Sequence, residues 1–355
     1  MQQLFGKPIR IISLLVPKMW LIEGNERITG KPLSVLWCGP IVQQAYMLTR
    51  IFGVKAPDRH YLGRRPVILL KHLLKRYGCS LGVVAGPDQL LTRLRQRDDI
   101  EVSWWIGSEV DIAAVLDPDD HPHSLKDDLR RVRKNGLEFR CATDAESYRR
   151  FYDNYYLPTI VASHGAAALP SDFDTRWSRI MKGEAELVWV MRGDEPICGM
   201  VVCYDDSVPI LRDIGIKNGD KALRKTGAIT AAYYFALQRI EARGFDRARL
   251  GLSRPFLNDG VLTFKEKFRP ELTGTSQESF LIRINSLCDA SRSFLSKSSF
   301  IGEAEGELRV TLIAANDDDY KARVPLLHRL SSIYGINACS YIDVSGRRPR
   351  IRKAS

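Results

Sequence analysis

A run of five residues, Arg224-Lys225-Thr226-Gly227-Ala228, has the composition of a helix start that binds an anion. Backbone N–H groups in the first turn of a helix have no partner within the helix and carry a partial positive charge, so phosphate groups are favoured there. Lys221 adds a further cation, and Gly227 lacks a Cβ, which would let a phosphate approach the backbone. The segment predicts a site for the pyrophosphate of a donor molecule.

Lys265 is a candidate for electrostatic catalysis in the segment Phe264-Lys265-Glu266-Lys267-Phe268. If the two phenylalanines pack inward, the ammonium faces a cleft, where a positioned cation can neutralise a developing oxyanion or a phosphate. The alternative is a surface lysine on an amphipathic turn.

Two further side chains are candidates for acid–base chemistry. Asp213 lies in mid-strand, where it could accept a proton from an acceptor amine or hydroxyl, or could simply pair with Arg212 or Lys217. His164 titrates near neutrality and could act as a base or contact the acceptor, although a loop histidine is more often polar surface.

Candidate substrate contacts lie in two places. Ser253 and Arg254 follow the end of a predicted strand, where binding residues concentrate. Arg130, Arg133 and Lys134 lie on a predicted helix and could bind an anionic acceptor such as a nucleotide-linked sugar. The alternative for that helix is a solvated charged face.

The elements that must position these residues are clearest in the middle of the chain. Three strands are predicted at 186–191, 197–204 and 208–216, followed by a helix from Thr226 to Gly244 and a strand at 247–252. The apolar stripe Ile229, Tyr233, Ala236 and Ile240 has helical spacing. Earlier helix starts are predicted by Ser124 with Asp127, by Thr143 with Glu146, and by Ser171 with Asp174.

The two ends of the chain also alternate strand and helix. In the N-terminal part we expect strands at 33–38, 81–85 and 100–106, and helices at 66–77 and 87–97. In the C-terminal part we expect a strand at 307–314, a helix at 321–333 and a strand at 338–344. The last ten residues hold five Arg or Lys and no acid, which predicts a disordered tail, with peripheral contact to an acidic membrane surface as a further use.

Composition narrows the class of protein. The chain has 355 residues, a net charge of +11 and 45% hydrophobic residues, which predicts about two or three globular domains with anionic partners. Seven scattered cysteines without a C-x-x-C pair argue against a zinc site or disulfide framework and fit a reducing cytosol. The best apolar run, 11–22, contains Pro17 and Lys18 and is shorter than the ~20 residues of a membrane span. We therefore expect a cytoplasmic protein that binds no metal.

The pattern of three strands, a cation-rich turn, a helix and a further strand resembles the core of the GNAT acyltransferase superfamily. Within it, the chain resembles the double-domain branch of Fem-type peptidyltransferases and the cellulose- and exopolysaccharide-associated acetyltransferases. The resemblance covers about 121–270 and rests on these segments: Ser124 to Leu137; Tyr156-Leu157-Pro158-Thr159 with His164-Gly165; and Phe245-Asp246, Gly251, Ser253-Arg254, Gly260 and Phe264 to Phe268. The phosphate loop departs from the superfamily pattern because Ile229 replaces its last small residue.

The resemblance implies a mixed α/β (α+β) fold with tandem GNAT-like lobes, each on a largely antiparallel sheet. It implies a degenerate lobe over 1–120 without its own donor site, an acyltransferase domain over 121–285 and a small α/β extension over 286–355. The implied reaction is transfer of an acyl group, acetyl from acetyl-coenzyme A above all, to an amine or hydroxyl of a saccharide or cell-envelope precursor. Two alternatives stay open: aminoacyl transfer from charged tRNA, as in Fem-type enzymes, and a non-catalytic anion- or RNA-binding protein on a decayed transferase fold. No nucleic acid other than tRNA is expected as a partner.

Overall fold

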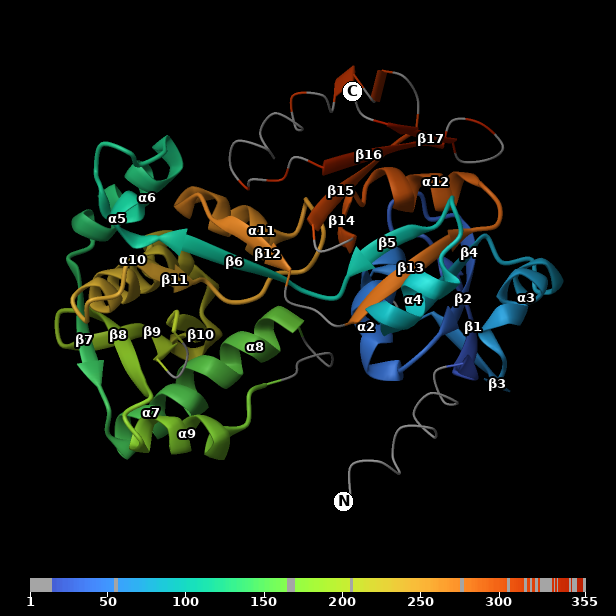
Figure 1. Ribbon diagram of the computed structural model, residues 1–355. Coiled ribbons are helices and arrows are strands. Elements are labelled where there is room, and N and C mark those ends of the chain that lie inside the picture. The colour runs from blue at the N-terminus through green and yellow to red at the C-terminus, as the bar shows by residue number, and fades with distance from the viewer. Residues whose placement is uncertain are drawn as a thin grey trace. The chain divides into compact units, whose positions relative to one another are not determined.

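The computed structural model describes the chain in six long stretches and several shorter ones between 318 and 353. The long stretches are 15–53, 57–164, 170–204, 207–274, 278–304 and 307–315. Two compact units are present (Figure 1). The first unit comprises Met1–Ile106, Ser253–Leu262 and Leu272–Ser355, and the second comprises Gly107–Leu252 and Thr263–Glu271. Each is described below by itself.

The second unit is built on a seven-stranded sheet of order β12-β6-β11-β10-β9-β8-β7. Its strands are β6 (Ile106–Asp111), β7 (Leu137–Ala142), β8 (Ala185–Arg192), β9 (Glu195–Cys203), β10 (Ile210–Ile216), β11 (Arg247–Arg249) and β12 (Glu271–Gly274). Strands β7 to β10 form an antiparallel meander, β10 and β11 are parallel, and β11 and β6 are antiparallel. The predicted three-strand meander and the strand after it are thus confirmed.

Helices cover both faces of this sheet. They are α5 (Ile112–Leu116), α6 (His123–Lys134), α7 (Ala145–Phe151), α8 (Leu157–His164), α9 (Phe173–Met181), α10 (Ala228–Glu241) and α11 (Gly260–Lys265). Shorter helical turns are η2 (Tyr152–Tyr156), η4 (Lys217–Gly219), η5 (Lys221–Thr226) and η6 (Glu266–Phe268). Helices α6 and α10 share one core with the sheet, and α7, η2 and α9 share another. The predicted stripe of α10 is confirmed, since Tyr233, Ala236 and Ile240 are buried and Ile229 packs against the same core.

The predicted helix starts are close but the capping residues differ. Helix α6 begins at His123 after Pro122, whose carbonyl accepts from the N–H groups of Leu125 and Lys126, so Ser124 is inside the helix. Helices α7 and α9 are capped by Asp144 and Asp172, rather than by Thr143 and Ser171. In each case the aspartate carboxylate accepts from the backbone N–H three residues later, which is the stronger charge-assisted cap.

The first unit contains a six-stranded sheet of order β3-β1-β2-β4-β13-β5 and a four-stranded sheet of order β14-β15-β16-β17. The six strands are β1 (Lys18–Asn25), β2 (Pro32–Cys38), β3 (Asp58–Arg64), β4 (Leu81–Pro87), β5 (Ile100–Ser103) and β13 (Glu278–Ile284). The four are β14 (Phe300–Ala304), β15 (Glu307–Ala314), β16 (Ala338–Asp343) and β17 (Arg350–Lys353). The helical segments are α2 (Ile41–Phe52), η1 (Val67–Leu69), α3 (Leu70–Arg76), α4 (Asp88–Leu94) and α12 (Asp289–Ser296).

The six-stranded sheet has the same pattern as the sheet of the second unit. One parallel pair, β2 with β4, is flanked by antiparallel pairs on both sides. It is not a parallel Rossmann-type sheet. The expected fold class, mixed α/β on largely antiparallel sheets, is confirmed for both units.

Three features differ from the sequence-based expectations. The strand predicted at 100–106 is two strands in different sheets, because the chain leaves the six-stranded sheet at Trp104 and joins the other at Ile106. Strand β13 returns after the second unit to pair between β4 and β5, so the compact units divide differently from 1–120, 121–285 and 286–355. The tail is not wholly disordered, since β17 pairs antiparallel with β16. The helix predicted at 321–333 lies largely outside the described residues.

Candidate functional site

The β10–α10–β11 crossover of the second unit places several predicted residues at one edge of the sheet. Because β10 and β11 are parallel and α10 connects them, the N-terminus of α10 lies at the carboxyl ends of these strands. Ligands of open α/β sheets bind outside the carboxyl ends of strands. The segment 221–228 is therefore at the edge where a ligand is expected.

The two parallel strands are paired over a very short length. Their register contains one position, Ile210 opposite Arg249. Further along β10, Arg212 and Asp213 together oppose a single residue of β9, because Leu211 pairs with Val202 and Ile214 with Met200. Such a bulge leaves backbone groups of the extra residue without ladder partners. An unpaired N–H in β10 is suited to polarise a carbonyl group.

Gly251 marks the end of β11. Its φ is +77°, and a Cβ at this position would lie 2.8 Å from the carbonyl oxygen of Leu211. The left-handed backbone and the close approach both require glycine here. The glycine therefore lets the backbone that follows β11 lie close to Leu211 of β10.

The cations of the predicted anion site are accessible. Lys221, Arg224 and Lys225 are exposed, Thr226 is half-buried, and Gly227 and Ala228 are buried. Gly227 has φ +90° and precedes α10 without a side-chain cap. A Cβ on Gly227 would lie 3.2 Å from Val132 Cγ2 of α6, so packing against α6 and the positive φ both favour glycine here. The approach of a phosphate to Gly227 stays a prediction.

Two neighbouring helices end at the same cationic segment. At the end of α6, Asn135 Nδ2 donates to the carbonyl of Thr226 at 3.3 Å. At the end of α8, Ser163 Oγ accepts from Arg224 Nη2 at 3.3 Å. His164 is the last residue of α8, so its backbone lies beside the segment, while its side chain is outside the described structure.

Arg133 and Lys134, also at the end of α6, are exposed. They lie in the last turn of α6, next to Asn135, which contacts Thr226. Arg130 is exposed as well and forms an ion pair with Asp127 at 3.4 Å. The structure thus brings Arg133 and Lys134 to the cationic segment, and Arg130 retains a partner of its own.

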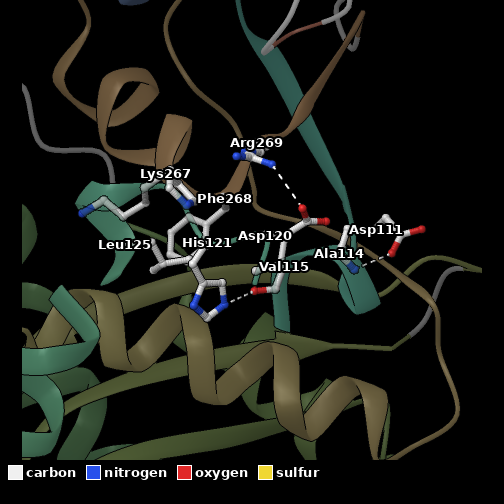
Figure 2. Close-up of a pocket in the computed structure, with 10 residues that line it drawn as sticks. Asp111, Ala114, Val115, Asp120, His121, Leu125, Lys267, Phe268 and Arg269 are labelled. Atoms are coloured by element: carbon white, nitrogen blue, oxygen red, sulfur yellow. Dashed lines mark hydrogen bonds and ion pairs between the residues drawn. The ribbon is translucent and has the colours of Figure 1, made fainter. Parts of the chain in front are cut away.

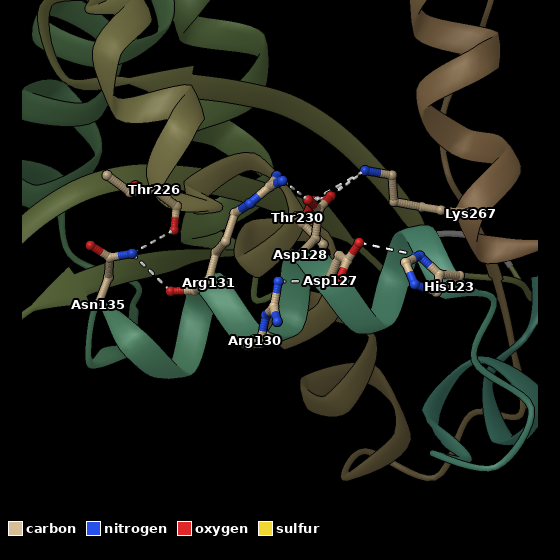
Figure 3. Close-up of polar contacts among 9 residues, drawn as sticks. All are labelled: His123, Asp127, Asp128, Arg130, Arg131, Asn135, Thr226, Thr230 and Lys267. Atoms are coloured by element: carbon tan, nitrogen blue, oxygen red, sulfur yellow. Dashed lines mark hydrogen bonds and ion pairs between the residues drawn. The ribbon is translucent and has the colours of Figure 1, made fainter.

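A polar network fixes α10 against α6 (Figure 3). The carboxylate of Asp128 accepts from the hydroxyl of Thr230 in the first turn of α10 at 2.8 Å, and it pairs with Arg131 at 2.8 Å and with Lys267. Burial alone would raise the pKa of Asp128, but the hydrogen bonds from Lys267 and Thr230 and the nearby cations hold it below its usual value. Sequence reasoning missed this network because its members are far apart in the chain.

Lys265 is buried, with 1% of its surface exposed. Its ammonium donates to the carbonyl oxygens of Gly251 at 2.9 Å and Leu252 at 3.1 Å. The expectation of an ammonium facing a cleft is corrected, because Phe268 stacks on Tyr233, Phe264 packs against the same ring in a tilted arrangement, and both draw this helical turn into the core. Lys265 holds the backbone at the point where β11 ends.

Asp213 is buried and both its oxygens are engaged. Oδ2 accepts from Arg176 Nε at 2.7 Å and Oδ1 from Ser171 Oγ at 2.8 Å. The ion pair is with Arg176 of α9, not with Arg212 or Lys217 as weighed from the sequence. The expected free general base is thus a paired carboxylate, and it lies on the face of the sheet that carries α9, whereas α10 packs with the other core.

A small pocket of about 60 Å³ lies elsewhere in the second unit (Figure 2). It is lined among others by His121, Leu125, Phe268 and Arg269, and Figure 2 shows His121 directed to the carbonyl of Val115, at 2.8 Å. This volume has room for a few water molecules but not for a donor. None of the residues predicted to bind a substrate lines it.

Ser253 and Arg254 belong to the first unit. Ser253 is buried and exchanges backbone hydrogen bonds with Ile106 at 2.9 and 3.0 Å. The guanidinium of Arg254 lies over the rings of Tyr46 and Trp105 at 4.0 and 3.6 Å. Sequence spacing gave no sign of these aromatic partners, since Tyr46 and Arg254 are distant in the chain.

Two features are absent from the described residues. No group of His, Cys, Asp or Glu in them could hold a metal ion. No helix among them combines the length and apolar character needed to cross a membrane.

Comparison with known proteins identifies one domain. Residues 120–265 match the family described as "Acetyltransferase (GNAT) domain". No curated protein matches the chain. Among solved structures, it is similar to the C-terminal domain of a putative lysylphosphatidylglycerol synthetase from Agrobacterium fabrum, with 12% identity, TM-score 0.37 and coverage of 77% of this chain and 83% of that one. It is also similar to FemX, with 10% identity, TM-score 0.39 and coverage of 73% and 83%. A third is a GCN5-related N-acetyltransferase from Kribbella flavida, with 11% identity, TM-score 0.29 and coverage of 84% and 62%.

Proposed function

We propose that this chain, whose residues 120–265 match the GNAT acetyltransferase domain family, transfers an acetyl group from acetyl-coenzyme A to an amine or hydroxyl of a saccharide or cell-envelope precursor. The family match supports acyl transfer. The choice of a coenzyme A donor is supported by the exposed cations 221–225 at the start of α10, at the carboxyl edge of β10 and β11.

The reaction proceeds by direct attack in this proposal. The lone pair of the acceptor amine or hydroxyl forms a bond to the thioester carbonyl carbon, the C–S bond breaks, and coenzyme A leaves as the thiolate. The acceptor proton passes to solvent or to the departing sulfur. No covalent bond to the protein forms.

Each part of the chain has a stated task. The cations Lys221, Arg224 and Lys225 bind the donor phosphates, together with the first turn of α10. A backbone N–H of the β10 bulge polarises the thioester carbonyl. Lys265 is a positioning residue in this scheme, because its ammonium fixes the carbonyls of Gly251 and Leu252 rather than touching the donor.

The test is donor binding to the purified full chain, followed by melting curves and calorimetry. A donor at about a hundred times its Kd stabilises the native state by about 2.7 kcal/mol, so acetyl-coenzyme A should raise Tm. The double variant Arg224→Gln/Lys225→Gln should weaken binding at least about tenfold. The matched control Arg140→Gln/Lys182→Gln, which removes two exposed cations elsewhere in the second unit, should bind normally.

Aminoacyl transfer from charged tRNA is the second candidate. The observation that favours it is the number of exposed cations at the end of α6 and in the segment 221–225, two elements that contact each other, since a long polyanion uses more cations than one pyrophosphate does. If millimolar acetyl-coenzyme A leaves Tm unchanged and aminoacyl-tRNA binds with a steep salt dependence, this candidate replaces the first. If both bind without turnover, the non-catalytic alternative holds; the pairing of Asp213 with Arg176 is the feature that favours it.

A further inference from the structure

The guanidinium of Arg254, in the first unit, lies close to three aromatic rings. Its Cζ lies 3.6 Å from the ring centroid of Trp105 and 4.0 Å from that of Tyr46, with Trp104 at 5.4 Å. Rings over a guanidinium hold it by cation–π attraction and restrict its orientation. The N–H groups at the edge of the guanidinium remain for hydrogen bonding.

One of the guanidinium nitrogens is buried without a partner. Arg254 Nη1 is buried and has no hydrogen-bond partner in the part of the chain that the structure describes. Burial lowers the pKa of Arg254 to about 10, so the side chain is still cationic at neutral pH. A buried donor of a charged group without an acceptor costs more free energy than a neutral one. Such a group calls for an acceptor from outside the chain.

The neighbouring carboxylate does not fill this role. Asp259 acts on Arg254 through its charge, but its oxygens accept from the Tyr46 hydroxyl at 3.3 Å and from the N–H groups of Val261 and Leu262 at 3.0 and 3.1 Å. Both oxygens of Asp259 therefore already have donors, and Oδ1 caps the first turn of α11.

A second arginine adds charge to the same cluster. Arg50 lies over the ring of Phe256 at 4.5 Å, and its Nε is likewise buried without a partner in the described chain. Arg50 and Arg254 against the one carboxylate of Asp259 leave a local excess of positive charge, to which Arg27 adds through its charge near Arg50. Tyr46, Trp104, Trp105 and Arg254 are all half-buried, so the cluster reaches solvent.

We propose that Arg254 binds a carboxylate of a small molecule at this aromatic cluster. A planar guanidinium presents parallel N–H donors that match the two oxygens of a carboxylate. The indole and phenol rings provide apolar walls for the remainder of the ligand. As recognition of the acceptor, this assignment rests on the proposed function; as a binding site, it does not.

The test is calorimetric titration of the full chain, without any donor, by benzoate, acetate, benzamide and inorganic phosphate. Benzoate combines a carboxylate with an apolar ring and should bind saturably, more tightly than acetate. Benzamide has the same shape without the charge and should not bind. Arg254→Gln should weaken benzoate binding at least about tenfold, and Arg254→Lys by less, because the ammonium keeps the charge but loses the fork. The control Arg76→Gln, which removes an exposed arginine near the ring of Tyr77 in the same unit, should bind normally.

Near-ultraviolet circular dichroism on each variant checks that it is folded. If Arg254→Gln does not fold, the benzoate affinity of Arg254→Lys serves as the test. The proposal is overturned if wild type gives no saturable response to benzoate, if phosphate binds more tightly than benzoate, or if a folded Arg254 variant keeps wild-type affinity. Because no donor is present, these results are independent of whether acetyl-coenzyme A binds at α10.

Discussion

Replacing Lys265 by methionine should destabilise the second unit, since the ammonium is buried and serves the backbone. Lys265→Met keeps the length of the side chain but leaves the carbonyls of Gly251 and Leu252 without these donors. A hydrogen bond from a charged donor contributes about 1.5–3 kcal/mol, so two contribute about 3–6 kcal/mol. Removing the buried ammonium also removes its desolvation cost, which offsets part of this lost free energy. The expected net loss is about 3 kcal/mol, near the upper end for single substitutions.

Urea unfolding followed by circular dichroism measures this loss directly, and a melting curve should show a Tm lower by about 6–12 °C for a unit of this size. The matched control is Lys182→Met on an exposed lysine, which should change stability by less than about 0.5 kcal/mol. If Lys265→Met retains wild-type stability, the two contacts carry no free energy. If it retains stability and loses turnover alone, Lys265 acts on the reaction, and the positioning role is wrong.

Three further substitutions test the site. Asp213→Asn should lower the free energy of unfolding by about 3 kcal/mol in urea titrations, because the buried Arg176 loses its charged partner; if Asp213 is not the base, the pH profile of any turnover keeps its shape. Gly251→Ala should lower the free energy of unfolding clearly more than Gly193→Ala. Both glycines have a positive φ, which penalises alanine by about 1 kcal/mol, but only Gly251 faces a carbonyl oxygen at 2.8 Å. Equal losses of stability would contradict the close approach. Asp128→Asn should reduce stability at neutral pH, and the difference from wild type should vanish in acid. The pKa of Asp128 in the folded protein lies below its value in the unfolded chain. Its carboxylate therefore contributes fully to stability above the unfolded pKa, and this contribution is lost as pH falls through the folded pKa. A stability difference that grows in acid would refute this prediction.

Local patterns predicted the parts of the site that are local in the chain. The meander at 186–216 and the apolar stripe of α10 are read from spacing and turn residues, and the structure has both. The ends of helices were displaced by one or two residues, because Asp144 and Asp172 compete with the neighbouring Thr143 and Ser171 for the same backbone N–H groups.

Long-range contacts account for what the sequence did not show. The spacing of Phe264 and Phe268 correctly indicates a packed turn, but it does not show that the ammonium between them turns inward to Gly251 and Leu252. Asp213 could be placed on a strand, whereas its partner Arg176 comes from a helix far away in sequence. The aromatic cluster around Arg254 likewise includes Tyr46, which is distant from Arg254 in the sequence and adjacent to it only in the folded chain.

The position of β13 has a consequence for the chain during its synthesis. Strands β4 and β5 do not adjoin each other, since β13 lies between them. β5 ends at Ser103 and β13 at Ile284, so roughly 180 further residues must be synthesised before the six-stranded sheet can be completed. At about 5–20 residues per second this is about 10–40 s on the ribosome, during which the pairing edges of β4 and β5 are open to other strands or to chaperones. Protease resistance of β1 to β5 should accordingly appear only in nascent chains that extend beyond Ile284.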